Sequence, residues 1–170
     1  MVKRQKRVEA SWGIAQMIVY FAKNDLEKVH CVPFEGYARR FDSLEHYVEY
    51  SFELLDRNVS KELFKEDWPI FTRTHDTPPA IYGESSKVSN SFISNGCVID
   101  GTVQDSIICR GCKIGKGTKI TRSIVLSMAK IGEDASLTDV VMDKYCTMTD
   151  RHHVEGDPEN VIYLKQGITV

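Results

Sequence analysis

The sequence lacks both a strong charge of one sign and a long hydrophobic run. Its formal net charge is only -2, which gives no global reason to expect nucleic acid or an acidic membrane surface as a partner. No stretch approaches the roughly 20 apolar residues of a membrane span. The apolar stretch 12–22 follows a basic run, but Gln16 and Tyr20 interrupt it and no small-residue cleavage site follows, which excludes a signal peptide. We therefore expect a cytoplasmic protein that binds neither nucleic acid nor membrane.

The sequence also lacks the usual motifs of an active site. It contains no G-x-x-x-x-G-K-[ST] and no G-x-G-x-x-G, and no nucleophile stands in a pattern with a base. Cysteine is sparse and odd in number, which favours reduced thiols over a disulfide framework. Cys109 and Cys112 form a C-x-x-C, but no second Cys or His pair lies at ligand spacing, so we interpret them as structural. We predict no catalytic residue and no metal site. The five cysteines are Cys31, Cys97, Cys109, Cys112 and Cys146.

Helical periodicity dominates the first 68 residues. Apolar residues at helical spacing predict an amphipathic helix over 12–24, with Ser11 as its N-cap. A short strand is expected over 28–34, at a sheet edge because of Pro33. Asp42 and Glu45 have the spacing of a capping box, which predicts a second helix that continues to Leu55. A short helix starting near Ser60 follows within 58–68, and the proline-rich segment 69–79 is expected to be an extended connector.

The second half of the chain is an internal repeat. Aliphatic residues recur every five or six positions, and a mostly small residue stands two positions before each of them. This pattern predicts a left-handed parallel β-helix of hexapeptide type, with three short sides per coil and about four coils, in a mainly β chain. An antiparallel β-sandwich would instead show period-two alternation. The predicted inward residues are Val88, Ile93, Val98, Val103, Ile108, Ile114, Ile120, Val125, Ile131, Leu137, Met142 and Met148; the small residues are Ser86, Ser91, Gly96, Gly101, Ser106, Cys112, Thr118, Ser123, Ala129, Ala135, Val140 and Cys146.

The open ends of such a stack need caps, and the segment 154–170 is the expected C-terminal cap. Two further groups of polar residues could bind a ligand. His152 and His153 are adjacent, but neighbours on a strand point to opposite faces, so a solvated corner is the better interpretation. The lysines Lys113, Lys116 and Lys119 surround a Gly-Lys-Gly turn and could form a basic ridge for a phosphate, although a solvent-facing coil edge explains them equally well.

The segment Gly36-Tyr-Ala-Arg-Arg-Phe-Asp-Ser-Leu44 resembles the junction segment of the ADP-glucose pyrophosphorylases. The resemblance continues through Glu66-Asp-Trp-Pro-Ile70, Pro78-Pro-Ala80 and the repeat, and covers roughly residues 26–170. It implies a C-terminal remnant of a nucleotidyltransferase-like α/β domain over 1–68, a connector over 69–79 and the β-helix over 80–170. By this resemblance the chain is a fragment that holds the end of the nucleotidyltransferase domain.

Catalytic members of that family read Gly-Tyr-Trp-x-Asp-Val-Gly-Thr at the junction, and the Asp helps to hold the catalytic Mg²⁺. Here Arg40 stands at the Asp position, Ala38 replaces the Trp and Asp42 replaces the second Gly. A guanidinium repels Mg²⁺ and cannot ligate it. The departure implies a non-catalytic regulatory subunit of glycogen synthesis that needs no cofactor itself and modulates ADP-glucose formation from ATP and glucose 1-phosphate.

The partner that the resemblance implies is a catalytic adenylyltransferase subunit, in a hetero-oligomer or a homo-oligomer. Arg39 and Arg40 are the residues that we expect to contact an effector or this partner; surface or interdomain ion pairs are the alternative. A catalytic adenylyltransferase is the second hypothesis, and Arg40 argues against it. A hexapeptide acyltransferase is the third, although such enzymes usually carry a catalytic histidine on or beside the coils.

Overall fold

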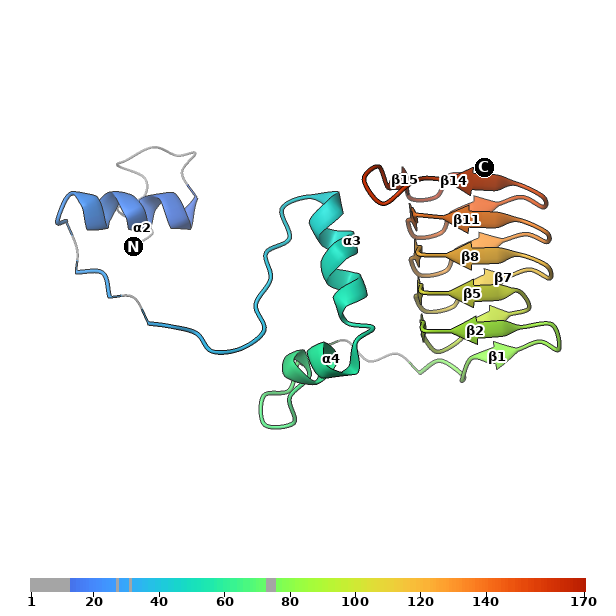
Figure 1. Ribbon diagram of the computed structural model, residues 1–170, viewed down its shortest axis with the longest axis horizontal. Coiled ribbons are helices and arrows are strands. Elements are labelled where there is room, and N and C mark those ends of the chain that lie inside the picture. Colours follow the sequence, from blue (N-terminus) through green and yellow to red (C-terminus); the bar gives the residue numbers. More distant parts are fainter. Residues whose placement is uncertain (1–12, 27, 31, 73–75) are drawn as a thin grey trace. The chain divides into compact units, whose positions relative to one another are not determined.

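The computed structural model describes residues 13–26, 28–30, 32–72 and 76–170 (Figure 1). The chain divides into two compact units, Met1–Glu35 and Gly36–Val170. None of the helices in the described ranges is long and apolar enough to cross a membrane. The basic run before residue 12, Ser11 and Cys31 lie outside the described residues.

The described part of the first unit contains the helix α2 (Ile14–Lys23). This confirms the predicted helix, but its N-cap is Gly13, so the prediction of Ser11 as the cap is wrong. The backbone N–H of Gly13 donates to Oε1 of Gln16 at 3.0 Å, which satisfies the start of the helix without a capping hydroxyl. The expected strand over 28–34 is also wrong, because residues 28–30 and 32–34 form no strand. A strand needs a neighbouring strand for its backbone groups, and the described part of this unit offers none.

The second unit begins with two helices, α3 (Leu44–Glu53) and α4 (Arg57–Leu63). The predicted second helix is confirmed, but its capping residue is Ser43, whose Oγ accepts the His46 N–H at 3.1 Å. The capping box from Asp42 is therefore wrong by one residue. The third helix begins before Ser60, because the carboxylate of Asp56 accepts the Asn58 N–H at 2.7 Å and caps the helix there.

The rest of the unit is a parallel β-helix of three five-stranded sheets. Figure 1 shows the coils stacked in chain order, with β1 at one end and the C-terminus at the other. The first sheet has the order β1-β4-β7-β10-β13, the second β14-β11-β8-β5-β2 and the third β15-β12-β9-β6-β3. The strands are β1 (Ile81–Tyr82), β2 (Lys87–Ser89), β3 (Phe92–Ile93), β4 (Val98–Ile99), β5 (Thr102–Gln104), β6 (Ile107–Ile108), β7 (Lys113–Ile114), β8 (Lys119–Thr121), β9 (Ile124–Val125), β10 (Lys130–Ile131), β11 (Ser136–Thr138), β12 (Val140–Met142), β13 (Thr147–Met148), β14 (His153–Glu155) and β15 (Ile162–Leu164).

The predicted inward residues stack in register between coils, with one exception at β4. There Ile99 pairs with Ile114 and is fully buried, whereas Val98 pairs with Lys113 and is 38% exposed. The prediction of Val98 as the inward residue is therefore wrong. Gly96 adopts a left-handed turn with φ +77°, so the strand begins one residue later and Cys97 takes the small-residue position.

The expected C-terminal cap packs against the end of the core. Val154, Ile162, Ile168 and Val170 contact the buried cluster, and Thr169 bridges to Thr147. The segment is more regular than a simple cap, because β14 and β15 extend the second and third sheets.

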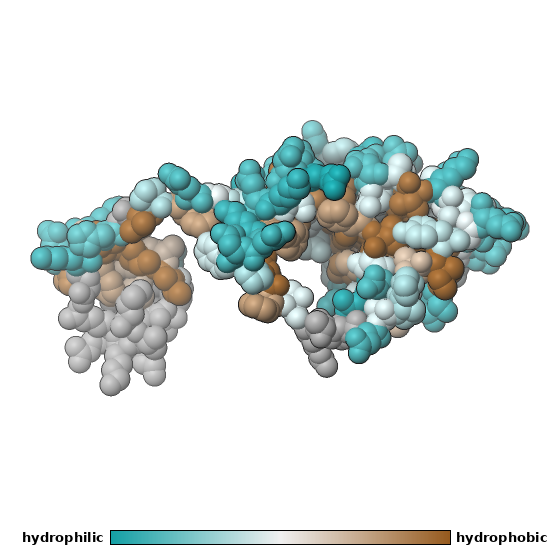
Figure 2. Space-filling model, turned by 90° about the horizontal axis from the view of Figure 1, so that it is seen from below, coloured by the Kyte–Doolittle hydropathy of each residue, from teal (hydrophilic) through white to brown (hydrophobic). Residues whose placement is uncertain are grey.

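The opposite end of the β-helix is apolar and less covered. Figure 2, which views the molecule from below, shows apolar residues gathered on this part of the surface. Ile81, Tyr82, Val88 and Phe92 of the first three strands are all exposed there. The first coil is thus the least protected part of the stack.

Candidate functional site

Arg39 ties the junction segment to α3. Its Nε lies 2.9 Å from Oε2 of Glu53, and its Nη2 donates to Oε1 of the same carboxylate at 3.2 Å. The guanidinium also lies over two aromatic rings, 4.6 Å from the centroid of Tyr37 and 5.4 Å from that of Tyr50. This bidentate, stacked arrangement engages an arginine fully within its own chain.

Glu53 collects the polar contacts of this cluster. Hydrogen bonds from Arg39 and then from the Tyr37 hydroxyl, at 2.8 Å, hold the pKa of the Glu53 carboxyl below its ordinary value. The same contact with Glu53 raises the pKa of Arg39. The carboxylate therefore stays ionised and keeps the junction segment bound to α3 at neutral pH.

Arg40 has a different environment from its neighbour. Its side chain is 85% exposed and makes one ion pair, with Nε 3.0 Å from Oδ2 of Asp42. Asp42 in turn contacts Nδ1 of His46 at 2.5 Å. The hydrogen bond with His46 is the main cause that lowers the pKa of Asp42. The structure thus brings both predicted arginines to one segment, but Arg40 is far more exposed than Arg39, whose side chain is 37% exposed.

The outward face of the third sheet is apolar along its whole length. The register aligns one apolar residue from each strand, whereas the first sheet carries lysines at the equivalent outward positions of β7 and β10. Ile124 and Val141 in the middle of this apolar column are almost fully buried, although neither belongs to the interior core cluster. The column consists of Phe92, Ile107, Ile124, Val141 and Tyr163.

We infer that α3 covers this column. Burial raises the pKa of Tyr47 on α3, and Cys109 and Asp143 at the end of the third sheet's strands raise it further, so the helix lies close to them. Phe52 of α3 also shares two grooves with residues of the β-helix, of about 480 and 320 Å³. The junction segment is thereby connected through α3 to the side of the β-helix.

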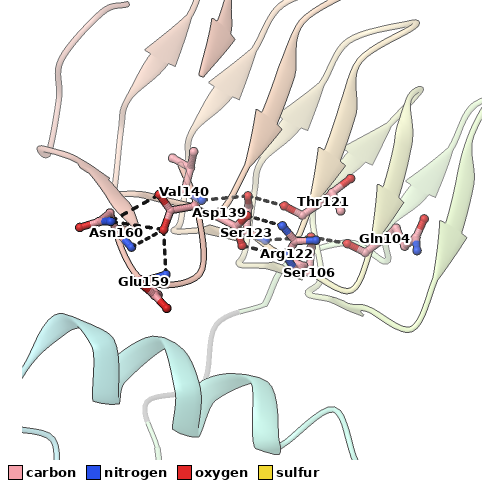
Figure 3. Close-up of polar contacts among 10 residues, drawn as sticks. Gln104, Ser106, Thr121, Arg122, Ser123, Asp139, Val140, Glu159 and Asn160 are labelled. Carbon is pink, nitrogen blue, oxygen red and sulfur yellow. Dashed lines mark hydrogen bonds and ion pairs between the residues drawn. The ribbon is translucent and has the colours of Figure 1, made fainter. Parts of the chain in front are cut away.

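One edge of the β-helix carries a polar column beside these grooves, and Figure 3 shows its members Arg122 and Asp139. Four residues with positive φ occupy successive coils at this corner, and each of them has a polar side chain. Nδ2 of Asn90 donates to Asp105 at 2.6 Å, and Arg122 forms two hydrogen bonds with the carboxylate of Asp139, with Nε at 2.8 Å from Oδ1. The contact with Asp139 raises the pKa of Arg122. We name this set the corner column; it consists of Asn90, Asp105, Arg122 and Asp139.

A ladder of serine hydroxyls lies directly inside the corner column, with Ser106 and Ser123 fully buried. The Ser91 Oγ accepts the Ser106 N–H at 3.1 Å. The Ser106 Oγ accepts the Ser123 N–H at 3.1 Å, and the Ser123 Oγ accepts the Val140 N–H at 3.2 Å (Figure 3). Each serine hydroxyl also donates to a carbonyl of its own coil. These bonds join successive coils where the strands stop, which explains why serine recurs at this small-residue position.

The other predicted ligand groups do not come together. Lys113 lies in the first sheet and Lys119 in the second, with Lys116 in the turn between them, so the three do not share one face. His153 contacts the Ser136 Oγ through Nδ1 at 2.7 Å, and His152 lies in the preceding turn. Within the described ranges, no group of three or more His, Cys, Asp or Glu side chains could hold a metal ion.

The stacked three-sided coils and their repeat define a hexapeptide-type parallel β-helix protein. The chain belongs to the GlmU-like, C-terminal hexapeptide family, whose family model matches residues 78–169. This places the family match on the β-helix and confirms the interpretation of the repeat.

The curated relatives extend the similarity into the helical segment. The chain is 36% identical over 135 residues to the glycogen biosynthesis protein GlgD of Bacillus subtilis, covering 79% of this chain and 39% of that protein. It is 50% identical over 70 residues to GlgD of Geobacillus stearothermophilus, covering 41% of this chain and 20% of the relative. It is 28% identical over 161 residues to the glucose-1-phosphate adenylyltransferase of Bacillus anthracis, covering 94% of this chain and 43% of the relative. The chain thus spans less than half the length of these relatives.

The corner column is the feature that sequence reasoning missed. Its residues directly precede the small-residue positions at or just before the start of the third-sheet strands, which are serine in three coils and Val140 in the fourth. Asn and Asp are the non-glycine residues that best tolerate positive φ. Asn90, Asp105 and Asp139 in this position could have predicted a corner with positive φ from the sequence. Arg122 breaks that rule and could be located only from the structure.

Proposed function

We propose that this chain is part of a non-catalytic regulatory subunit of glucose-1-phosphate adenylyltransferase in glycogen biosynthesis, and that it acts in the cytoplasm. The observation that carries the proposal is Arg40. A cation at the position where catalytic relatives have the Mg²⁺-binding Asp opposes metal binding. The Arg40 side chain is exposed to solvent and forms an ion pair with Asp42. The similarity to the two GlgD proteins supports the same reading.

In this proposal the chain modulates a partner and does not make ADP-glucose itself. The partner is a catalytic glucose-1-phosphate adenylyltransferase subunit, and the assembly is a hetero-oligomer. Arg40 is the exposed contact for the partner or for an anionic effector, whereas Arg39 supports it by fixing the junction segment on Glu53. Residues 1–68 would complete a nucleotidyltransferase-like domain, 69–79 would connect it, and 80–170 would form the β-helix domain.

The decisive experiment measures ADP-glucose formation from ATP and glucose 1-phosphate by the chain alone, by the catalytic subunit of the same cell and by their mixture. We expect no product from the chain alone and an altered rate or effector response in the mixture. Light scattering of the same mixture should detect a complex. ADP-glucose formation by the chain alone would contradict the proposal, as would a chain that neither binds the enzyme nor changes its rate.

A matched pair of variants tests the role of Arg40. Arg40→Ala should weaken the effect on the catalytic subunit without changing the fold, because the side chain is exposed. Arg57→Ala, which removes another exposed arginine of the same unit, is the control and should leave the effect unchanged. Equal effects of the two variants would show that Arg40 does not make the contact and that other residues carry the regulatory function.

A further inference from the structure

Two cysteines meet inside the first sheet of the β-helix, and the C-x-x-C motif does not describe them. The parallel register of β4 and β7 pairs Val98 with Lys113. Cys97 directly precedes Val98 and Cys112 directly precedes Lys113, so the two cysteines occupy equivalent positions on adjacent coils. Both side chains are fully buried and belong to the interior core cluster. The Cys97 thiol donates to the carbonyl oxygen of Cys109 at 3.1 Å, and the Cys112 thiol donates to that of Leu126 at 3.2 Å. The structure thus pairs Cys112 with Cys97 across the coils, and not with its sequence neighbour Cys109.

The spacing of the two cysteines suits a disulfide. Neighbouring strands of a sheet lie about 4.8 Å apart, which is within the range of about 4.4–6.8 Å between the Cα atoms of bonded cysteines. Cys146 occupies the same corner further along the stack, but Ala129 lies between it and Cys112. Two strand spacings, about 9.6 Å, are too long for a disulfide. The geometry therefore selects one pair from the buried cysteines.

The chemical environment of the pair also favours reaction. The adjacent Cys112 side chain lowers the pKa of Cys97 to about 7, whereas the adjacent Cys97 side chain and burial raise the pKa of Cys112. A thiolate is the reactive form of cysteine, so Cys97 is the nucleophile of the pair. Only β1 separates its strand from the end of the first sheet, where the exposed apolar coil is least protected. A small oxidant reaches this position when the first coil opens locally.

We propose that Cys97 and Cys112 form a redox modification site, in which a peroxide oxidant links the second and third coils through a disulfide. The Cys97 thiol first releases its proton, and the thiolate attacks one peroxide oxygen. The O–O bond breaks, a sulfenic acid forms, and the leaving hydroxide takes up the released proton to give water. The Cys112 sulfur then attacks the Cys97 sulfur, the S–O bond breaks, and the leaving hydroxide takes the thiol proton to form a second water. Two thiols are oxidised and one hydrogen peroxide is reduced.

Peptide mapping of the full chain tests this pairing. The reduced protein is treated with hydrogen peroxide, free thiols are blocked with N-ethylmaleimide, and the chain is digested with trypsin and Asp-N without reduction. Cleavage after Lys87, Arg110 and Lys113 and before Asp100 and Asp105 places Cys97 in 88–99, Cys109 in 105–110 and Cys112 in 111–113. A cross-linked pair of 88–99 with 111–113 is expected. Links through Cys109, or no link, would overturn the proposal.

Two variants distinguish loss of the disulfide from loss of folding. Cys97→Ala should fold, because Ala129 already occupies the same corner position in a later coil, and peroxide should leave its melting temperature unchanged. Cys109→Ala should still form the cross-link. In the unaltered chain, the disulfide should raise the melting temperature, because it closes a loop of the unfolded chain. An oxidised chain that melts at or below the reduced one would contradict the proposal that this corner accommodates the disulfide.

Discussion

Replacing Asp139 with Asn tests whether the corner column stabilises the β-helix through charge. Asp139 is only 4% exposed, and its carboxylate accepts two hydrogen bonds from Arg122, with Nε at 2.8 Å. Its φ of +52° is a conformation that Asn tolerates, and the two side chains have nearly the same volume. Asp139→Asn therefore removes the charge while it preserves the backbone and the packing.

The magnitude follows from how the two partners are exposed. Removing one member of a buried ion pair typically costs about 3–5 kcal/mol, because the other charge stays buried without a partner. Here the Arg122 side chain is 47% exposed, so it regains hydration when the carboxylate is lost. The Asn oxygen also retains one neutral hydrogen bond, which is weaker than the charged bond by about 1 kcal/mol. We expect Asp139→Asn to lower the free energy of unfolding by about 1–2 kcal/mol.

A double-mutant cycle in urea measures this interaction directly. The four proteins are the unaltered chain, Asp139→Asn, Arg122→Gln and the double variant, and the expected coupling energy is about 1 kcal/mol. Lys130→Gln, which changes an exposed residue of the same β-helix, should stay within about 0.5 kcal/mol of the unaltered chain. A coupling energy indistinguishable from zero would refute the argument, because it would make the pair a surface contact without energetic consequence.

The β-helix could be predicted from the sequence because each side of a coil repeats the same two requirements. An aliphatic residue fills the interior and a small residue fits the corner, and these requirements produce a periodic pattern in the sequence. The prediction failed at β4, where Val98 and Ile99 are adjacent and both satisfy the aliphatic rule. Only the turn at Gly96, with φ +77°, decides between them. Periodicity identifies a repeat, but backbone conformation at the corners determines its register.

The helical segment was predictable to the level of its elements and not of their ends. Asp42 and Ser43 are both good capping residues, and the choice between them depends on a competing contact, since Asp42 binds the ring of His46. The strand expected over 28–34 failed for another reason. Strand propensity is a local property, whereas a strand forms only where another strand accepts its hydrogen bonds.

The candidate site was only half predictable. The family pattern identified Arg39 and Arg40 as the unusual residues, yet the two look equivalent in the sequence. The structure separates them, because the aromatic rings of Tyr37 and Tyr50 and the carboxylate of Glu53 hold only Arg39. Glu53 lies 14 residues away, and both Glu53 and Tyr50 belong to α3, whose position relative to the junction segment cannot be read from the sequence. Whether Arg40 contacts a partner or an effector stays a prediction.

Three further variants follow from the structure. Gly115→Ala should destabilise the β-helix by about 1–3 kcal/mol in thermal unfolding. The added Cβ would lie 2.4 Å from the carbonyl oxygen of Gly132, and the backbone would have to shift to relieve this clash. An unchanged melting temperature would contradict this. Ile120→Ala should cost about 2–5 kcal/mol in urea, since the side chain is fully buried between coils. Glu53 predicts a pH dependence. Its pKa is lowered in the folded chain, so the contact with Arg39 contributes stability above the ordinary pKa of Glu, and this contribution is lost as the pH falls through the lower, folded value. NMR titration of the Arg39 side-chain signals should therefore show a transition below the ordinary pKa of Glu, and Glu53→Gln should abolish it. Identical titrations of the two proteins would mean that another group controls the junction.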